Sequence, residues 1–310
     1  MDDRSGVLAG IGGTPMVRLA HLGSPDMAEV WVKLEAANPT GSYKDRMALA
    51  MIEGAERRGV LQPGQAVVEY TGGSTGSSLA LVCAVTGHPL RIVTSDAFAA
   101  AKLDTMRAFG AQVEVIPSPE GIHPELIASM IRRATEIADQ EGAYPTNQFH
   151  NTDMVDGYRE MGEEIARDLD GPVDAFCSYV GTAGCFLGVT RALVERHPRM
   201  LRVAIEPTES AVLSGGEPGT HRIEGGGAGF VPPLLSAGDI DRVETVSTTE
   251  AIDMARRAAN TEGLFSGPST GANLLVALRL ATELGPGRRV VTVQCDSGLK
   301  YLAGGIHGQS

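Results

Sequence analysis

The sequence predicts an α/β protein built from two three-layer lobes with mostly parallel sheets. Three observations support this prediction: strand and helix patterns alternate along residues 66–142, the alternation starts again after Asn151, and glycine-rich segments follow several strands. Repeated strand–helix–strand order produces a parallel sheet with helices on both faces. A chain of 310 residues is long enough for two such lobes, and we expect them to meet near residue 150.

The first lobe is predicted from short apolar runs that alternate with helix-spaced ones. The runs predict strands over residues 66–70, 91–94 and 112–116. The helix-spaced segments predict helices over residues 75–86, 99–109 and 124–140. Gly110 is expected to end the second of these helices.

The second lobe repeats the pattern with different spacing. Strands are expected over residues 173–180, 202–206 and 289–295, and helices over 185–195, 249–260 and 270–284. A glycine-rich segment, residues 225–229, interrupts the alternation. In sheets of this kind ligands bind at the carboxyl ends of the strands, so the glycine loops there are the first candidates for a site.

The composition argues against several classes of protein. A net charge of −12 argues against a nucleic-acid or anionic-membrane partner. The sequence opens on no charged-then-apolar leader and has no apolar run of membrane-spanning length, so a cytoplasmic location is expected. The four cysteines lack CxxC spacing, which is typical of reduced thiols, and the seven histidines lack metal-ligand spacing, so no metal site is expected.

Residues 38–46 form the most informative segment, because they place Lys44 behind a Pro/Gly/Ser turn where a helix is about to begin. Only four lysines occur in the chain. A lysine held near a helix start and kept out of water can have a lowered pKa and act as a nucleophile. The alternative is a solvated helix start, which is the commoner role of a Lys-Asp-Arg triplet.

Two glycine-rich loops occur in the same strand–loop–helix context, one in each lobe. Residues 181–185 bring small side chains and helix-start amides together, which favours an anion such as phosphate. Residues 71–76 add three hydroxyl groups and suit a carboxylate or a second phosphate. Either loop alone is equally well explained as a tight turn with a helix cap. Two such loops together with a candidate lysine amine are less easily explained as turns, and favour an anion-binding site.

Other polar residues carry weaker signals. Ser269 or Thr270 would ordinarily cap the helix that follows residues 265–268. Glu69 is interpreted as a charge at a strand end rather than a catalyst. The chain has no GxSxG segment, which disfavours a serine hydrolase.

Taken together, these motifs resemble the pyridoxal-phosphate fold-type II family, specifically its cysteine synthase (O-acetylserine sulfhydrylase) and cystathionine β-synthase branch. The resemblance runs from residues 11–15 to residues 296–301, nearly the whole chain. Besides the lysine segment it includes residues 147–149, 206–216 and 221–232. It implies the tryptophan synthase β-like fold, with a smaller mobile domain over 41–149 and a larger cofactor-binding domain over 1–40 and 150–310. It also implies a homodimer.

The resemblance further implies a role for each site residue. Lys44 would hold pyridoxal 5'-phosphate as a Schiff base and act as the catalytic residue. The other cofactor-binding residues would be Ser74, Gly181, Thr182, Ala183, Gly184, Cys185 and Ser269, with Ser269 facing the pyridine nitrogen. The substrate would be bound by Thr71, Gly72, Ser74, Thr75, Gln148 and Gly226, and residues 225–229 would line the facing wall.

The implied reaction is β-replacement on serine or an O-activated serine through an α-aminoacrylate. Sulfide or another thiol would add at the β-carbon and give cysteine or a β-substituted alanine. The enzymatic alternative is a lyase or dehydratase that releases a 2-oxo acid and ammonia. A more remote alternative is a non-catalytic binding protein on the same fold.

The chain departs from the family pattern in the loop over residues 71–76, which usually reads Thr-Ser-Gly-Asn-Thr-Gly. Gly72 lacks a hydroxyl and adds backbone freedom, and Ser74 is shorter than the usual asparagine. Ala183 and Cys185 replace a common glycine and threonine, and residues 95–102 also differ. We therefore hypothesise a relaxed or specialised β-replacement enzyme, with ordinary cysteine synthesis as the alternative.

Overall fold

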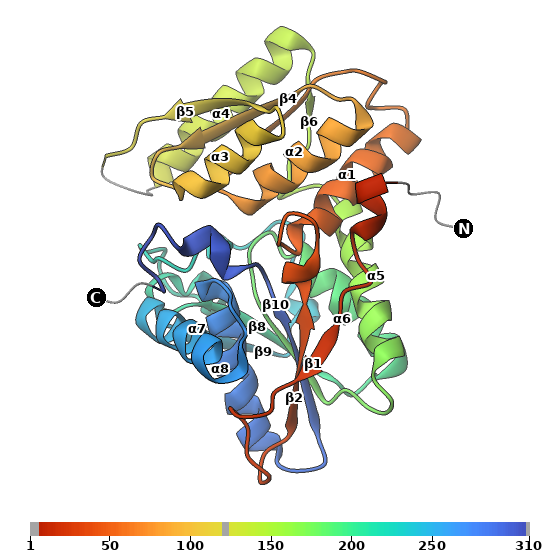
Figure 1. Cartoon of the computed structure of the whole chain (residues 1–310), viewed down its shortest axis with the longest axis vertical. Coiled ribbons are helices and arrows are strands. Elements are labelled where there is room, and N and C mark those ends of the chain that lie inside the picture. Colours follow the sequence, from red (N-terminus) through yellow and green to blue (C-terminus); the bar gives the residue numbers. More distant parts are fainter. Residues whose placement is uncertain (1–5, 120–123, 308–310) are drawn as a thin grey trace.

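The computed structural model describes residues 6–119 and 124–307. Its strands form two separate sheets, one in each lobe, and the lobes follow one another along the long axis of the molecule (Figure 1). The larger sheet has the strand order β1 (Met16–Arg18), β2 (Glu29–Leu34), β10 (Arg289–Gln294), β7 (Ala175–Tyr179), β8 (Leu201–Pro207), β9 (Arg242–Val246). The smaller sheet has the order β5 (Gln112–Ile116), β4 (Leu90–Ser95), β3 (Val67–Tyr70), β6 (Tyr144–Pro145). All neighbouring strands are parallel except β1 and β2. The α/β fold class with mostly parallel sheets is confirmed.

Within residues 6–119 and 124–307, eight α-helices surround the two sheets. They are α1 (Lys44–Arg57), α2 (Ser74–Thr86), α3 (Ala100–Ala108), α4 (Pro124–Glu141), α5 (Asp153–Asp168), α6 (Gly184–Arg196), α7 (Thr248–Glu262) and α8 (Pro268–Leu284). Short 3₁₀ helices occupy Gly6–Gly10, Glu35–Ala37, Thr208–Ser210, Val212–Ser214, Ala237–Asp239 and Gly298–Tyr301. Each of the six helices expected from the sequence is present, with its ends shifted by at most two residues.

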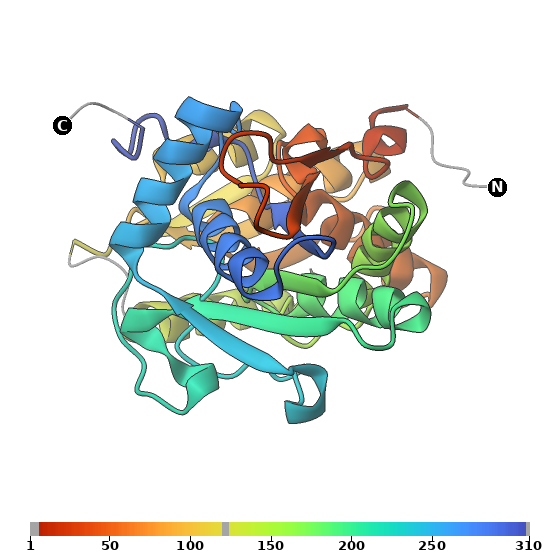
Figure 2. The ribbon, with the colours of Figure 1, turned by 90° about the horizontal axis from the view of Figure 1, so that it is seen from below.

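The larger sheet is buried on both faces, as the near-continuous apolar sequence of its parallel strands requires. In β7, Ala175, Cys177 and Tyr179 face the core shared with α7 and α8, whereas Phe176 faces the core shared with α5 and α6. Figure 2, viewed from below, shows α7 and α8 in blue and the helices of the opposite face in green. The alternation follows from the period of two along a strand.

The smaller sheet is covered in the same way. In β3, Val67 joins the core packed by α2, and Val68 joins a separate cluster packed by α4. Met130 and Ile137 of α4 belong to that second cluster and are almost fully buried. The predicted division into domains over 41–149 and over 1–40 plus 150–310, and the mobility of the smaller one, stay predictions.

Helix α1 links the lobes, because it packs against α2 on one side and α5 on the other. Its Arg46 is buried and lies 2.8 Å from Glu35 and 2.7 Å from Glu164, while Lys33 of β2 lies 2.8 Å from the same Glu164. Buried charges are tolerated only when they are paired and hydrogen-bonded. The pairs therefore fix the first turn of α1, which carries Lys44, against the larger lobe.

Among the strands and α-helices of the described residues, the sequence analysis did not identify five. Strand β2 has the run Val30-Trp31-Val32, rich in strand-forming residues, and could have been recognised. Helix α5 has two interior glycines, which weaken its helical signal. In the structure a Cβ on Gly157 would lie 2.7 Å from the Arg46 carbonyl oxygen, so this glycine lets α5 approach α1 closely. The other three are β1, β6 and β9.

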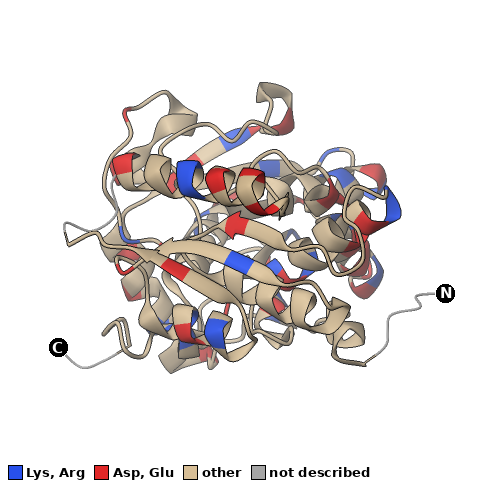
Figure 3. Cartoon of the chain, turned by 90° about the horizontal axis from the view of Figure 1, so that it is seen from above, with Lys and Arg blue, Asp and Glu red and all other residues tan. Residues whose placement is uncertain are grey.

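The outer surface mixes both signs of charge. Viewed from above, basic and acidic residues are interspersed along the helices (Figure 3). Among the described residues, no helix is both long and apolar enough to span a bilayer, and no group of side chains has the make-up of a metal site. All four cysteines are free and buried.

Candidate active site

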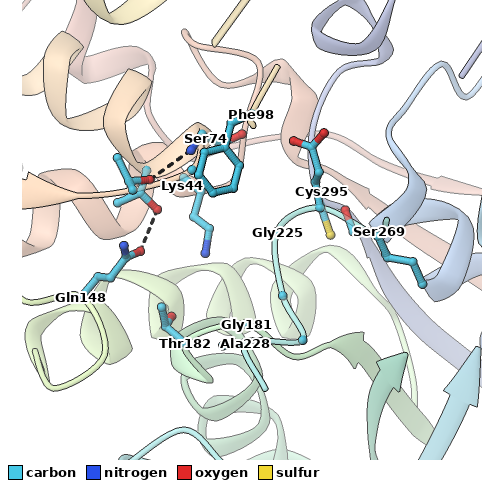
Figure 4. Close-up of a pocket in the computed structure, with 18 of the residues that line it drawn as sticks. Lys44, Ser74, Phe98, Gln148, Gly181, Thr182, Gly225, Ala228, Ser269 and Cys295 are labelled. Atoms are coloured by element: carbon cyan, nitrogen blue, oxygen red, sulfur yellow. Dashed lines mark hydrogen bonds between the residues drawn. The ribbon is translucent and has the colours of Figure 1, made fainter. Parts of the chain in front are cut away.

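A cavity of about 240 Å³ lies between the two lobes, where the strands of both sheets end. Its walls come from the loops after β3, β7 and β10, from the start of α8 and from residues 221–230. Figure 4 shows Lys44 pointing into this space, with Gln148 and Ser269 on opposite sides. The cavity is therefore placed where parallel α/β sheets bind their ligands.

The Lys44 amine is held out of water in the cavity. Its side chain is 6% exposed, and its Nζ lies 4.7 Å from the centre of the Tyr43 ring. Burial lowers the pKa of Lys44, because the charged ammonium is poorly solvated there. A lysine with a lowered pKa is a better nucleophile and base near neutral pH.

Lys44 is anchored by the loop after β10. The Tyr43 N–H donates to the Cys295 carbonyl at 3.0 Å, and the Ser297 N–H donates to the Gly41 carbonyl at 2.9 Å. These bonds form a short antiparallel bridge around Ser42. Lys44 thus takes its position from the larger lobe, although α1 extends toward the smaller one.

The loop over residues 71–76 leaves β3 and starts α2. Its Gly73 N–H donates to the Thr71 hydroxyl at 3.1 Å, and the Thr75 hydroxyl donates to the Gln148 amide oxygen at 2.9 Å. Both threonines and Gln148 are buried and line the cavity. The loop therefore presents hydroxyl and amide groups to the ligand space.

Glu69 braces this loop from behind. Its carboxylate accepts from the Thr146 hydroxyl at 2.5 Å and from the Gln148 N–H at 3.1 Å. Burial raises the pKa of Glu69 to about 7, and these hydrogen bonds oppose the rise. Glu69 does not line the cavity, so it positions Gln148 and does not face the ligand.

The loop over residues 181–185 packs against the backbone of residues 225–226. A Cβ on Gly181 would lie 2.5 Å from the Gly225 carbonyl oxygen, and a Cβ on Gly226 would lie 2.4 Å from the Val180 carbonyl oxygen. The hydrogen bond from Leu187 N–H to the Ala183 carbonyl is the first of the α6 turn. The N–H groups of residues 184–186 precede it and have no carbonyl of their own helix to donate to. This helix start is suited to an anion.

The remaining wall comes from the start of α8 and the end of β10. Ser269, in the first turn of α8, is 3% exposed and lines the cavity. Beside it, burial raises the pKa of the Cys295 thiol to about 12, so this thiol is protonated at neutral pH. Asp296 accepts from the Tyr301 hydroxyl at 2.6 Å through Oδ2, while its Oδ1 has no partner among the described residues.

The cavity brings together most residues expected from the sequence. Those that line it are Lys44, Thr71, Gly72, Ser74, Thr75, Gln148, Gly181, Thr182, Gly226 and Ser269. Ala183, Gly184 and Cys185 do not line it and lie buried at the start of α6. A contact of these three with a ligand would run through backbone groups.

Sequence reasoning did not identify Phe98, Lys102 and Glu224, which also line the cavity. Phe98 and Lys102 come from the segment before and within α3, and their side chains lie against Gly72 and Gly73. Two adjacent glycines in a buried loop leave volume that another side chain must fill, because protein interiors are close-packed. The two glycines therefore indicated that a large side chain packs against the loop, although the sequence alone does not identify that side chain.

Comparisons with known proteins agree on one family. A family model described as pyridoxal-phosphate dependent enzyme matches residues 7–296. A cysteine synthase of Staphylococcus aureus is 40% identical over 295 residues, which is 94% of each chain. An O-acetyl serine sulfhydrylase isoform 3 of Entamoeba histolytica superposes with a TM-score of 0.92 at 34% identity and covers 100% of this chain and 94% of its own. An O-acetylserine dependent cystathionine beta-synthase of Helicobacter pylori gives 0.91 at 34%, with coverages of 99% and 100%.

Proposed function

The chain belongs to the pyridoxal-phosphate-dependent enzymes as a cysteine synthase-like member, and we propose that its cavity exchanges the β-substituent of serine or an O-activated serine for a thiol. The observation that carries the proposal is the buried Lys44 amine, with its lowered pKa, in one cavity with residues of both glycine-rich loops. The first loop suits a carboxylate and the second suits a phosphate.

The residues present fit pyridoxal phosphate, the cofactor of the family. The group needs an amine, a phosphate site and a partner for its ring nitrogen. Lys44 supplies the amine and the start of α6 supplies amides for the phosphate. Ser269 supplies a neutral hydroxyl for the ring nitrogen. Ser74, which lines the cavity at the start of α2, would contribute its hydroxyl to the cofactor site.

We assign the chemistry as follows. When bound, pyridoxal phosphate withdraws electrons from the α-carbon of the amino acid. The Lys44 amine accepts the α-proton as general base and later returns it. The leaving group departs from the β-carbon with the bonding electron pair, and the thiol sulfur forms the new bond while releasing its proton. One donor and one thiol therefore give one β-substituted alanine and one protonated leaving group, without net oxidation.

The chain's other residues bind and orient the substrate. Thr71, Thr75 and Gln148 would hold the α-carboxylate, since their hydroxyl and amide groups converge on one wall. Gly226 would line the opposite wall, where only backbone fits. We further propose that the smaller domain, 41–149, moves onto the substrate and excludes water.

The assembly and location are also proposals. The family resemblance supports a homodimer. The four free cysteines and the absence of a membrane-spanning helix among residues 6–119 and 124–307 support a cytoplasmic location.

The test is the absorption spectrum of the purified protein and of Lys44→Ala, before and after adding serine, O-acetylserine and O-phosphoserine separately. The wild type should carry a visible band that changes with one donor. Lys44→Ala should lose that band, and turnover should fall by at least about a thousandfold. An unmoved spectrum with all donors would overturn the proposal. Donor-dependent pyruvate release that added thiol does not suppress would make the protein a lyase.

A further inference from the structure

The loop over residues 71–76 packs closely against Phe98, before α3, and Lys102, within α3. A Cβ on Gly72 would lie 2.3 Å from the Phe98 ring, and a Cβ on Gly73 would lie 2.7 Å from Cδ of Lys102. Both distances are far below a van der Waals contact, so each large side chain occupies the place of a missing one. Phe98 therefore stands inside the ligand cavity at the level of the loop, as Figure 4 shows beside Ser74.

The charge that comes with this segment is compensated. The side chain of Lys102 is 3% exposed, and its ammonium group forms an ion pair with Glu224 of the larger lobe. It also lies 4.6 Å from the centre of the Tyr301 ring. Apart from Lys44, the charged residues that line the cavity are Lys102, Arg222, Glu224 and Asp296, which balance in formal charge. Arg222 is exposed at the rim.

Around Phe98 the wall of the cavity is apolar. The large apolar or aromatic side chains that line the cavity include Tyr70, Phe98, Ile127, Met130, Phe149 and Phe230. The first four belong to or pack against one hydrophobic cluster of the smaller lobe. The last two face each other across the lobes, with ring centroids 5.0 Å apart. This wall is therefore continuous with a hydrophobic core of the smaller lobe.

We propose that this wall is the acceptor subsite, that it selects an organic thiol with an apolar substituent over hydrosulfide, and that Phe98 is its specificity-determining residue. The inference rests on the proposed β-replacement. Hydrosulfide is a small anion that gains from an uncompensated cation or several donors, and the apolar wall offers it neither. An apolar substituent gains free energy roughly in proportion to the apolar area that it buries there. The thiol proton leaves with the displaced group, so the exchange balances as before.

The experiment compares three acceptors on the holoenzyme with the donor found above: hydrosulfide, phenylmethanethiol and 2-mercaptoethanol, a polar thiol of similar acidity. The wild type should favour phenylmethanethiol over both in kcat/KM, by about tenfold or more. Phe98→Ala should reduce that preference by about tenfold, and Phe98→Leu should retain most of it. Phe109→Ala, an aromatic truncation in the same lobe that does not line the cavity, should leave the preference unchanged.

A binding measurement separates recognition from rate. S-benzyl-L-cysteine should bind the wild type more tightly than S-(2-hydroxyethyl)-L-cysteine by calorimetry, with a more negative heat-capacity change, and Phe98→Ala should remove the difference. If the donor is consumed but hydrosulfide is the best acceptor and Phe98→Ala does not move the ratios, this inference is overturned and the β-replacement stands. If no donor changes the spectrum, the proposed function fails and the subsite with it.

Discussion

The two glycine loops have the same position at the end of a parallel strand, yet one packs against backbone and the other against a side chain. Gly181 of the second loop lies against backbone, because the carbonyl oxygen of Gly225 occupies the place of a side chain. Gly72 of the first loop lies against the Phe98 ring. Backbone cannot be exchanged by mutation, whereas a facing side chain can. The difference teaches that backbone fixes the shape of the second loop, whereas the first loop can be reshaped by substitutions at Phe98.

The comparison also bears on the hypothesis of a specialised enzyme. Gly72 was expected to add freedom to the carboxylate loop, but the Phe98 ring fills the released space. The departure at Gly72 and the departure in residues 95–102 are therefore in direct contact through Phe98. A serine returned to position 72 would need Phe98 to give way.

The largest effect is expected at Gly226→Ala, where the new Cβ would lie 2.4 Å from the Val180 carbonyl oxygen and 2.5 Å from the Tyr179 ring. Backbone must shift, so unfolding free energy should fall by about 3 kcal/mol. Cofactor retained after dialysis, read from visible absorbance, should fall at least about tenfold. Gly238→Ala, with nothing within 4 Å of its Cβ, is the matched control. Equal behaviour of the two variants would break the contrast between the loops.

A second test asks whether the first loop is coupled to pH through Glu69. Because burial raises the pKa of Glu69 from 4.5 to about 7, the folded state binds this proton more tightly than the unfolded state. Its contribution to stability is complete below about pH 4.5 and is lost as the pH rises through about 7, by about 3 kcal/mol in total. Urea unfolding from pH 4.5 to 8 should show this loss in the wild type and a flatter profile in Glu69→Gln. Parallel profiles would contradict the assignment.

A smaller effect is expected for Gly72→Ser. The Cβ would lie 2.3 Å from the edge of the Phe98 ring, which can move, so the loss of stability should be about 1–2 kcal/mol. In Gly72→Ser/Phe98→Ala the serine has room, and the double-mutant cycle should show a favourable coupling of about 1 kcal/mol. Additive effects would show that the two positions are independent. Adding Ser74→Asn to the double variant then tests whether donor or acceptor preference returns to the family pattern.

The smallest effect is expected for Ala183→Gly. Ala183 has a φ of 69°, a left-handed conformation that costs a residue with a Cβ about 1–2 kcal/mol. Glycine removes this cost but loses more entropy on folding, so unfolding free energy should rise by about 0.5 kcal/mol. A decrease would show that the Ala183 methyl group, 3% exposed, contributes more by packing than its backbone conformation costs.

The sequence predicted the parts of this molecule that depend on local pattern. The expected strands and helices and both glycine loops follow from periodicity and from glycine at strand ends. The pairing of β2 with β10 joins the two ends of the chain, which no local window reports. Helix α5 was missed because Gly157 serves helix packing at the expense of helix propensity. Phe98 was missed because its partner Gly72 is defined by volume rather than by sequence spacing.

The bridge that holds Ser42 against Asp296 joins residues about 250 positions apart, and it has a consequence for biosynthesis. Synthesis proceeds from the N-terminus at about 5–20 residues per second, so Lys44 leaves the ribosome many seconds before the loop that seats it. All strands of the smaller sheet are made before β10. The backbone beside Lys44 has no hydrogen-bond partner in the larger lobe until the loop after β10 is made. The site is therefore completed only when synthesis is nearly finished, and a chain that stops before residue 289 cannot assemble it.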